Sequence, residues 1–434
     1  MSEQKTVAFH TLGCKVNQYD TQAMRERFEQ AGYRTTEFDE QADIYVVNTC
    51  TVTGTGDKKS MQIIRRCHRQ NPLAQIVVTG CLAQRAADEL TLPGVRLVLG
   101  TQRRGEVVQL LEQAMAQDCT LVAVETLRKA PFEHLTVHAH EGHTRATMKI
   151  QEGCDRWCTY CIIPSVRGPI RSRPVDEIRA EAESLAQAGF KEVVLTGIHL
   201  TSYGRDFTPR QTLLDAIRAV QDVPGVRRIR LGSLEPTVAT VEFAQTLRTM
   251  DKVCPQFHLA LQSGSDTVLQ RMARRYNMRM YRQAMENLRA VYPMAAFTTD
   301  VLTGFPGETE AEFEETRAFI REARYAKIHV FPYSQREGTK AAVMPGQLSN
   351  AEKERRARLL IAVGDEMARQ YREQWVNEVA EVLLEEPVNG HWTGYTPEYI
   401  AVTLPEGYPG YQGEFVRVRL MGLNENGMDG VPCE

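Results

Sequence analysis

Short apolar runs alternate with amphipathic segments along the first quarter of the chain. The apolar runs lie at residues 6–9, 42–47 and 75–78. They are rich in β-branched residues, which is typical of buried strands, and the stretches at 20–32 and 57–70 have the periodicity of helices. This alternation predicts an open parallel α/β domain over residues 1–115.

The same alternation continues through the middle of the chain. Strand-like runs begin near residues 147, 192, 228, 257, 296 and 327, with helical stretches between them. Six consecutive βα units predict a partial (βα)6 TIM-like barrel, in which functional residues lie at the carboxyl ends of the strands. We place this domain at 143–372, after a linker at 116–142 that contains Pro131.

The pattern changes again in the last sixty residues. Alternating apolar and polar positions occur at 378–385, 391–395, 399–404 and 414–420, separated by Gly, Pro and Asn. Such segments are typical of short antiparallel strands, so residues 373–434 are expected to form a small β-barrel. A chain of 434 residues is longer than a single hydrophobic core usually supports, which agrees with an α/β protein of three domains.

The composition indicates a globular protein of the cytoplasm with no membrane association. Hydrophobic residues make up 42% of the chain and charged residues 25%, and no apolar run approaches the roughly 20 residues that cross a bilayer. The amino terminus has no signal-peptide pattern. Ten cysteines over this length are too few for a secreted disulfide scaffold, which favours a reducing compartment.

Arginine is concentrated in short runs although the net charge is −3. These runs lie at 64–69, 167–173, 226–230, 271–282 and 353–358. Basic patches on an acidic background would supply contacts to RNA phosphates. Each run alone is more typical of a solvated helix face, so only their convergence on one surface would favour nucleic-acid binding.

Three cysteines, Cys154, Cys158 and Cys161, lie in one short segment that offers no fourth ligand nearby. In a 4Fe–4S cluster, three thiolates leave one iron open to bind and activate a small molecule. A structural zinc site is the alternative, but closed zinc sites need four ligands and usually come from paired CxxC motifs. The spacing therefore favours a catalytic iron–sulfur cluster.

Three further cysteines each follow one of the predicted amino-terminal strands. Because the carboxyl ends of parallel strands gather at one edge of a sheet, the thiols of Cys14, Cys50 and Cys81 should meet there. Isolated buried cysteines are common and usually inert, so the prediction depends on this repeated position. The remaining cysteines have no such position and are expected to bind nothing: Cys67, Cys119, Cys254 and Cys433.

The spacing CxxxCxxC, with Tyr160 before the third cysteine, resembles the signature of the radical S-adenosylmethionine enzymes, whose open iron chelates the amino and carboxylate groups of that cofactor. Segments similar to those of the methylthiotransferases occur in chain order along almost the whole length. They lie at 10–20, 47–52, 78–82, 261–266 and 304–309. The resemblance implies a second 4Fe–4S cluster on the cysteines at 14, 50 and 81, again with one open iron that would hold the sulfur.

The resemblance also implies a pocket for S-adenosylmethionine in the central domain. Polar residues occur near the ends of successive predicted strands, where each one alone could simply cap its strand. The residues expected to line the pocket are Tyr160, Thr196, Gly197, Ser233, Glu235, Gln262, Asp300 and Tyr333.

The last domain resembles a TRAM domain, an RNA-binding module, which favours tRNA as the substrate. Its aromatic residues Trp392, Tyr395 and Tyr399 are expected either to stack on bases or to pack a core. An electron donor such as flavodoxin or ferredoxin and a sulfur donor are the other expected partners.

The methylthiotransferases include three substrate classes: tRNA bearing threonylcarbamoyladenosine, tRNA bearing isopentenyladenosine, and ribosomal protein S12. Segments 11–18, 195–200 and 230–236 are most similar to the first class. The expected reaction converts N6-threonylcarbamoyladenosine at position 37, in the anticodon loop, into its 2-methylthio derivative. A non-catalytic iron–sulfur RNA-binding or redox-sensing protein is the alternative from a different class.

Overall fold

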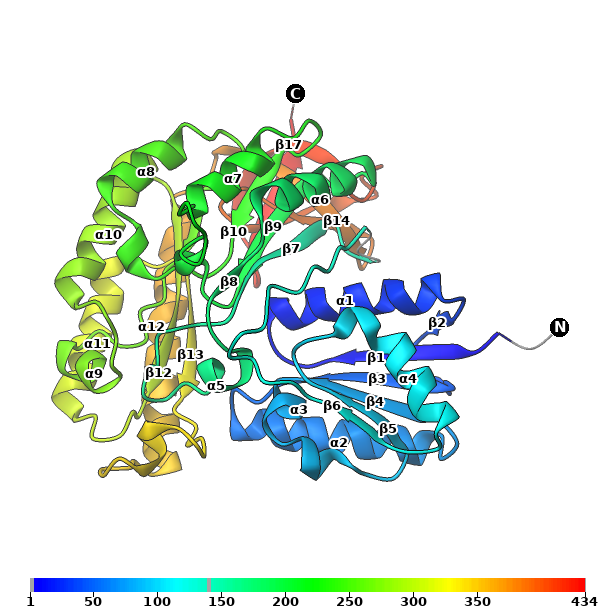
Figure 1. Ribbon diagram of the computed structural model, residues 1–434. Helices are drawn as coiled ribbons and strands as arrows, with labels where there is room; N and C mark the ends of the chain where they lie inside the picture. The colour runs from blue at the N-terminus through cyan, green and yellow to red at the C-terminus, as the bar shows by residue number, and fades with distance from the viewer. Residues whose placement is uncertain (1–3, 139–141, 434) are drawn as a thin grey trace.

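Six parallel strands form the first sheet of the computed structural model, which describes residues 4–138 and 142–433 (Figure 1). The strands are β1 (Thr6–Thr11), β2 (Arg34–Thr36), β3 (Ile44–Thr49), β4 (Gln75–Gly80), β5 (Val95–Leu99) and β6 (Leu121–Ala123). Their order is β2-β1-β3-β4-β5-β6, so the three strands that precede the cysteines are neighbours. The open parallel α/β fold is confirmed, and β6 extends the sheet into the segment expected to be a linker. Residues 139–141 of that segment lie outside the described residues.

Helices cover both faces of this sheet because side chains alternate between faces along each strand. The helices are α1 (Lys15–Gln30), α2 (Gly54–Gln70), α3 (Cys81–Arg85) and α4 (Val107–Ala116). On β3, Ile44 and Val46 pack toward α1 and α4, whereas Tyr45 and Val47 pack toward α2 and α3. Each loop that leaves a strand therefore emerges at the edge where the next helix begins.

Six parallel strands follow one another through the central domain. They are β7 (Arg145–Glu152), β9 (Glu192–Gly197), β10 (Arg228–Leu231), β11 (Gln256–His258), β12 (Ala296–Thr303) and β13 (Lys327–Pro332), with β8 (Arg171–Ser172) antiparallel at the β7 edge. Parallel bridges from Ile229 to Val253 and from Leu234 to Leu259 join the two halves. The predicted partial (βα)6 barrel is confirmed.

Seven helices accompany these central strands, and most lie on their outer side (Figure 1). They are α5 (Ile163–Arg167), α6 (Val175–Gln187), α7 (Leu213–Gln221), α8 (Val241–Arg248), α9 (Asp266–Arg271), α10 (Met278–Val291) and α11 (Glu310–Ala323). Their apolar faces and the strands form one continuous core, which includes Ile178, Ile217 and Leu288. Among the described residues, no helix is long and apolar enough to cross a bilayer.

A long helix, α12 (Asn350–Glu373), leads to a closed five-stranded barrel. Its strands are β14 (Val379–Val388), β15 (His391–Tyr395), β16 (Ala401–Glu406), β17 (Phe415–Leu423) and β18 (Met428–Pro432). The sequence predicted the first four strands. It missed β18 because Gly427 and Gly430 weaken the strand pattern there, although both are enclosed between neighbouring strands.

Several arginine runs lie inside the molecule. Arg228 and Arg230 are buried, and the Arg230 Nε lies 2.8 Å from a carboxylate oxygen of Glu192. Arg167 and Arg173 are likewise buried in ion pairs. For these residues, neither a phosphate-binding patch nor a solvated helix face is the right description, because their charges are used between elements of the protein.

Two aromatic residues of the terminal barrel face the central domain. The rings of Tyr395 and Tyr399 stack with centroids 4.6 Å apart, and the Arg145 guanidinium lies 4.9 Å from the Tyr399 centroid. Arg230 lies 4.6 Å from the same ring. These cation–π contacts hold the two domains together, so Tyr395 and Tyr399 are interface residues in this structure.

Candidate active site

The three amino-terminal cysteines lie together at one edge of the first sheet. Cys14 precedes α1, Cys50 directly follows β3 and Cys81 begins α3 after β4. A Cβ atom added to Gly13 would lie 3.0 Å from the Cys50 Sγ, which shows how closely the loop before Cys14 approaches that thiol. Cys14 and Cys50 are also charged neighbours of the Cys81 thiol, so the three segments lie near one another.

Burial raises the pKa of the thiols at this edge. It raises the pKa of Cys50, and it raises that of Cys81 to about 11 although Arg167 opposes the shift. The Arg167 Nε donates to the Cys81 Sγ at 3.1 Å. Without a metal these two thiols stay protonated near neutral pH, and metal binding would release their protons.

The three central cysteines lie in the loop between β7 and α5. The backbone N–H of Cys154 donates to the Gly168 carbonyl at 3.0 Å, and that of Cys161 donates to the Cys158 carbonyl at 3.0 Å. Burial raises the pKa of Cys154 to about 11 and that of Cys161 to about 12. Cys158 is a charged neighbour of Cys154, and both are charged neighbours of Cys161, so the three thiols of this trio also lie close together.

The two trios lie on elements that touch each other. Cys81 packs with Ile162 and Val166, which directly follow the central cysteine loop. The Thr101 hydroxyl, from the amino-terminal domain, donates to the Val166 carbonyl at 3.1 Å. The helix α5 therefore joins the two cysteine sites.

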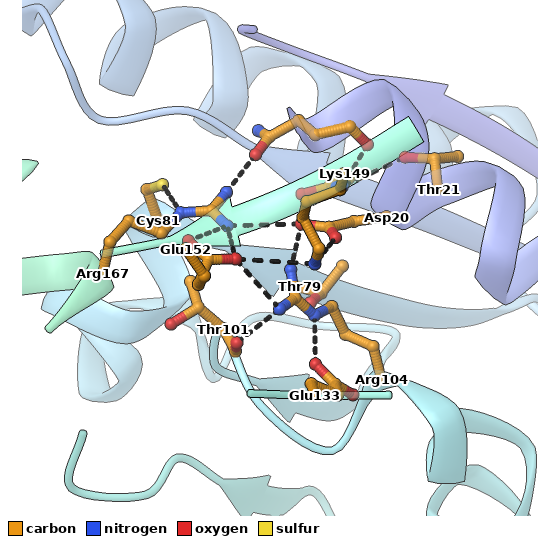
Figure 2. A network of polar contacts seen from close by, with 12 residues as sticks. Asp20, Thr21, Thr79, Cys81, Thr101, Arg104, Glu133, Lys149, Glu152 and Arg167 are labelled. Carbon is orange, nitrogen blue, oxygen red and sulfur yellow. Dashed lines mark hydrogen bonds and ion pairs between the residues drawn. The ribbon is translucent and has the colours of Figure 1, made fainter. Parts of the chain in front are cut away.

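Figure 2 shows a buried ionic network at this junction. Arg167 is completely buried, and its Nη1 lies 3.0 Å from a carboxylate oxygen of Glu152 and 3.3 Å from one of Asp20. Lys149 also reaches both carboxylates, and Arg104 pairs with Asp20. Burial alone would raise the pKa values of Asp20 and Glu152, but these cations hold both below their usual range.

A second arginine contacts the central trio. The Arg274 Nη1 donates to the Cys158 Sγ at 3.3 Å. The Arg156 Nη2 forms an ion pair with a carboxylate oxygen of Glu235 at 2.9 Å, and that oxygen lies 3.1 Å from the His199 Nε2. Burial opposes ionisation of Glu235, but the hydrogen bond from His199, together with the charges of Arg274 and Arg156, lowers its pKa to about 2. This carboxylate is therefore ionised beside the cysteine loop.

Most residues expected in the S-adenosylmethionine pocket lie at strand ends. Thr196 and Gly197 end β9, and Gly197 lies against Gln151 of β7. Ser233 is exposed just after β10, and Glu235 is buried two residues later. These positions agree with a pocket opening at the carboxyl end of the barrel.

The remaining expected pocket residues occupy two places. Gln262 has a left-handed backbone with φ of 65° and bridges to β12, while Asp300 lies within β12 and not at its end. Tyr160 and Tyr333 both pack against Phe305, with ring centroids 6.4 and 5.6 Å away. Two aromatic residues far apart in the sequence thus meet beside the cysteine loop.

Sequence reasoning missed the charged residues that surround the cysteines. Arg167 and Arg274 belong to arginine runs that the sequence presented only as surface charge. The available signal was their position along the chain: Arg167 ends α5, the helix that follows Cys161, and Arg274 comes shortly after α9, the helix that follows Gln262. Asp20, Lys149 and Glu152 carried no signal, because single charges on an amphipathic helix or strand are normally solvated.

The donor atoms suit two iron–sulfur clusters. Each trio supplies three thiols, which are the usual ligands of such clusters, and each has an arginine that contacts one thiol and can offset thiolate charge. Over residues 4–138 and 142–433, no three His, Cys, Asp or Glu side chains converge closely enough to hold a single metal ion. Three thiols per trio are the donor set that a 4Fe–4S cluster with one uncapped iron would need.

Two family models match the chain. Residues 6–100 match the uncharacterized protein family UPF0004, and residues 148–320 match the radical SAM superfamily. The first match contains the amino-terminal cysteines and the second contains the central ones. Among solved structures, the radical S-adenosylmethionine methyltransferase TsrM from Kitasatospora setae is similar at TM-score 0.56 and 14% identity, covering 79% of this chain and 74% of that chain. This likeness concerns the fold.

Curated relatives match over nearly the full length. A threonylcarbamoyladenosine tRNA methylthiotransferase MtaB from Bacillus subtilis is 44% identical, covering 95% of this chain and 97% of the relative. A tRNA-2-methylthio-N(6)-dimethylallyladenosine synthase from Symbiobacterium thermophilum is 35% identical, covering 95% of this chain and 91% of the relative. Both similarities span all three domains.

Proposed function

We propose a function from the premise that this chain belongs to the tRNA methylthiotransferases, a family of radical S-adenosylmethionine enzymes. It is an enzyme that attaches a methylthio group to tRNA. Its cofactors are two 4Fe–4S clusters and S-adenosylmethionine, and both cysteine trios are present in the chain.

The substrate is N6-threonylcarbamoyladenosine at position 37 of tRNA, in the anticodon loop, and the product is its 2-methylthio derivative. The observation that carries this conclusion is the 44% identity to a threonylcarbamoyladenosine enzyme over nearly the whole chain. Identity to the dimethylallyladenosine enzyme is lower, at 35%. Ribosomal protein S12 and a non-catalytic sensor are not favoured.

The central trio would hold the cluster that binds S-adenosylmethionine, and the amino-terminal trio would hold the second cluster. When bound, the first cluster would supply the electron for reductive cleavage of S-adenosylmethionine, and the second would supply an iron for sulfur. We propose the eight residues named above as the pocket, with Glu235 as its ionised carboxylate.

Charged residues of this chain position the cysteine sites and offset the charge of their thiolates. Arg167 and Arg274 each donate to one cysteine sulfur, and each also has a carboxylate neighbour, Glu152 at 3.0 Å and Glu235 at 3.8 Å, that favours this orientation. The network around Asp20 fixes α1 against β7, which sets one cysteine site relative to the other.

The domains divide the remaining tasks. We assign residues 1–115 to the second cluster, 143–372 to the radical chemistry and 373–434 to RNA binding, with 116–142 as the connection. An electron donor such as flavodoxin or ferredoxin and a separate sulfur donor would complete the reaction. All ten cysteines are free thiols, which agrees with a reducing cytoplasm.

Nucleoside mass spectrometry of tRNA from a deletion strain tests the function. We expect 2-methylthio-N6-threonylcarbamoyladenosine to be missing and to return with the wild-type gene, while the unmethylthiolated nucleoside accumulates. Unchanged product would reject the assignment.

A separate assay addresses the sensor alternative. Reconstituted protein given dithionite and S-adenosylmethionine should form 5′-deoxyadenosine. Its absence at full cluster loading would favour the sensor.

A further inference from the structure

A polar pocket of about 410 Å³ opens at Lys15, the residue that follows Cys14. It lies where α1, the strands β7 and β9 and the terminal barrel meet. Its lining includes Lys15, Gln18, Arg145, Thr147, Glu385 and Tyr399. The volume is within the range of small-molecule sites, and the side chains are mostly polar.

Lys15 is the cation in this pocket that has no counter-ion. It directly follows Cys14, and within the part of the chain that the structure describes its amine forms no hydrogen bond or ion pair. Arg145 is engaged, because its Nε lies 2.6 Å from a carboxylate oxygen of Glu385 and its guanidinium lies over Tyr399.

The charges around Lys15 favour an anion. Arg145 and Arg230 are the strongest charged neighbours of its amine, and they outweigh the opposing charge of Glu192. The other acidic residue of the lining, Glu386, is exposed to solvent. An incoming carboxylate would therefore meet the unpaired Lys15 amine, with Arg145 nearby and amide and hydroxyl groups around it.

We propose that this pocket receives the threonylcarbamoyl group of the substrate adenosine and that Lys15 binds its carboxylate. The inference rests on the proposed function. The base must approach the Cys14 site to receive sulfur at C2, and the substituent on N6 belongs to the same ring, so it would enter the adjoining pocket. The substituent carries a carboxylate, a hydroxyl and a urea group, which match a polar lining.

This contact would select the substrate. An apolar isopentenyl group would leave the Lys15 amine desolvated without a partner, and a site built around a polar contact strongly rejects an analogue that lacks it. Lys15 is accordingly a specificity-determining residue. It acts on the substrate and not on the chemistry.

The test compares two substrates and two variants of the full-length, anaerobically reconstituted enzyme. One tRNA carries threonylcarbamoyladenosine, and the other carries its methyl ester, which lacks the negative charge. We expect Lys15→Gln to lower kcat/KM on the acid by about 10- to 100-fold, the range for a hydrogen bond to a charged group, and to change kcat/KM on the ester by less than about twofold. Lys59→Gln, at an exposed lysine of α2, should change neither.

Other results would overturn the proposal. Equal losses on acid and ester would indicate a contact to an RNA phosphate, and no loss on either would indicate no contact. Iron content and 5′-deoxyadenosine formation without tRNA should match the wild type in Lys15→Gln, since a loss there would mean that Lys15 supports Cys14 instead. Failure of the wild-type enzyme on the acid would reject the proposed function, and that result is distinguishable from all of these.

Discussion

The two cysteine sites are built in opposite ways. The central trio lies within eight residues of one loop, whereas the amino-terminal trio comes from three strands whose cysteines are 36 and 31 residues apart. Yet both sites have the same types of residue beside the cysteines. Each has one arginine that donates to one thiol, and in each the first cysteine follows a glycine with positive φ, Gly13 or Gly153.

This contrast shows which part of a site a motif can encode. The spacing of the cysteines within one loop is enough to define the central site, and the family signature consists of that spacing. The other site depends on the order β1-β3-β4, because neighbouring parallel strands bring the three cysteines to one edge. Its geometry is therefore a property of the sheet, and damage to the sheet or to the junction would affect it first.

Removing each trio should separate the two sites most clearly. Changing Cys154, Cys158 and Cys161 to Ala should abolish 5′-deoxyadenosine formation. Changing Cys14, Cys50 and Cys81 to Ala should preserve it but abolish the methylthio product. Each triple variant should lose about four of eight irons, measured by iron and sulfide analysis.

Two other cysteines serve as controls for this experiment. Cys119→Ala and Cys433→Ala should keep the full iron content, because neither residue lies at a strand end of the first sheet or in the central loop. The two-site comparison would fail if either triple variant bound eight irons, or if one triple variant lost all of them.

The junction between the sites should be the next most sensitive region. Asp20→Asn removes the carboxylate that Lys149, Arg104 and Arg167 share and leaves Glu152 as the buried carboxylate beside them. Because buried cations are then incompletely neutralised, we expect a loss of about 3–5 kcal/mol in the free energy of unfolding at pH 7. Denaturant unfolding of the iron-free protein measures it. An unchanged stability would mean that the domains dock independently of this network.

The same variant predicts a pH dependence. The folded state lowers the pKa of Asp20 below its unfolded value of 3.8, so the stabilisation is complete above that value and is lost as the pH falls through the lower folded pKa. The difference between wild type and Asp20→Asn should therefore shrink below about pH 4. A constant difference down to pH 3 would contradict this assignment.

The two glycines should respond unequally. A Cβ at Gly153 would lie 1.8 Å from the Pro169 carbonyl oxygen, a backbone atom, whereas one at Gly13 would lie 3.0 Å from the Cys50 side chain. We expect Gly153→Ala to cost about 3 kcal/mol and Gly13→Ala about 1–2 kcal/mol, measured by denaturant unfolding. Gly32→Ala, at a positive φ with open space around it, isolates the backbone contribution.

The arginines should give the smallest and most specific effects. Arg167→Lys should lower the reduction potential of the amino-terminal cluster by tens of millivolts and leave the central cluster unchanged, because hydrogen bonds to sulfur favour the reduced state. Arg274→Lys should lower the reduction potential of the central cluster and leave that of the amino-terminal cluster unchanged. Potentials measured on the two triple cysteine variants separate the clusters, and a shift of both potentials in either variant would contradict a local effect.

Much of the fold followed from periodicity, and the reasons for the exceptions are physical. The six central strands and the amino-terminal alternation were recognisable because β-branched runs are separated by amphipathic helices. The strands β2, β5, β6 and β18 were among those missed. β2 and β6 have only three residues each, which gives too short a pattern, and the glycines of β18 serve packing.

The candidate site was predictable only in part. The cysteines were found from spacing and from their positions after strands. Arg167, Arg274 and the partners of Asp20 were not, because a charge becomes buried only through tertiary contacts that no local pattern reports. Tyr395 and Tyr399 illustrate the same limit, since base stacking and interface packing place the same residue types on a barrel surface.

Anomalous diffraction at the iron absorption edge, on anaerobic crystals of the full chain, tests the central claim most directly. The account predicts two separate iron clusters, one within bonding distance of Cys14, Cys50 and Cys81 and the other of Cys154, Cys158 and Cys161, on either side of the junction formed by α5. Iron at only one trio, or iron bound by Cys67, Cys119, Cys254 or Cys433, would contradict it.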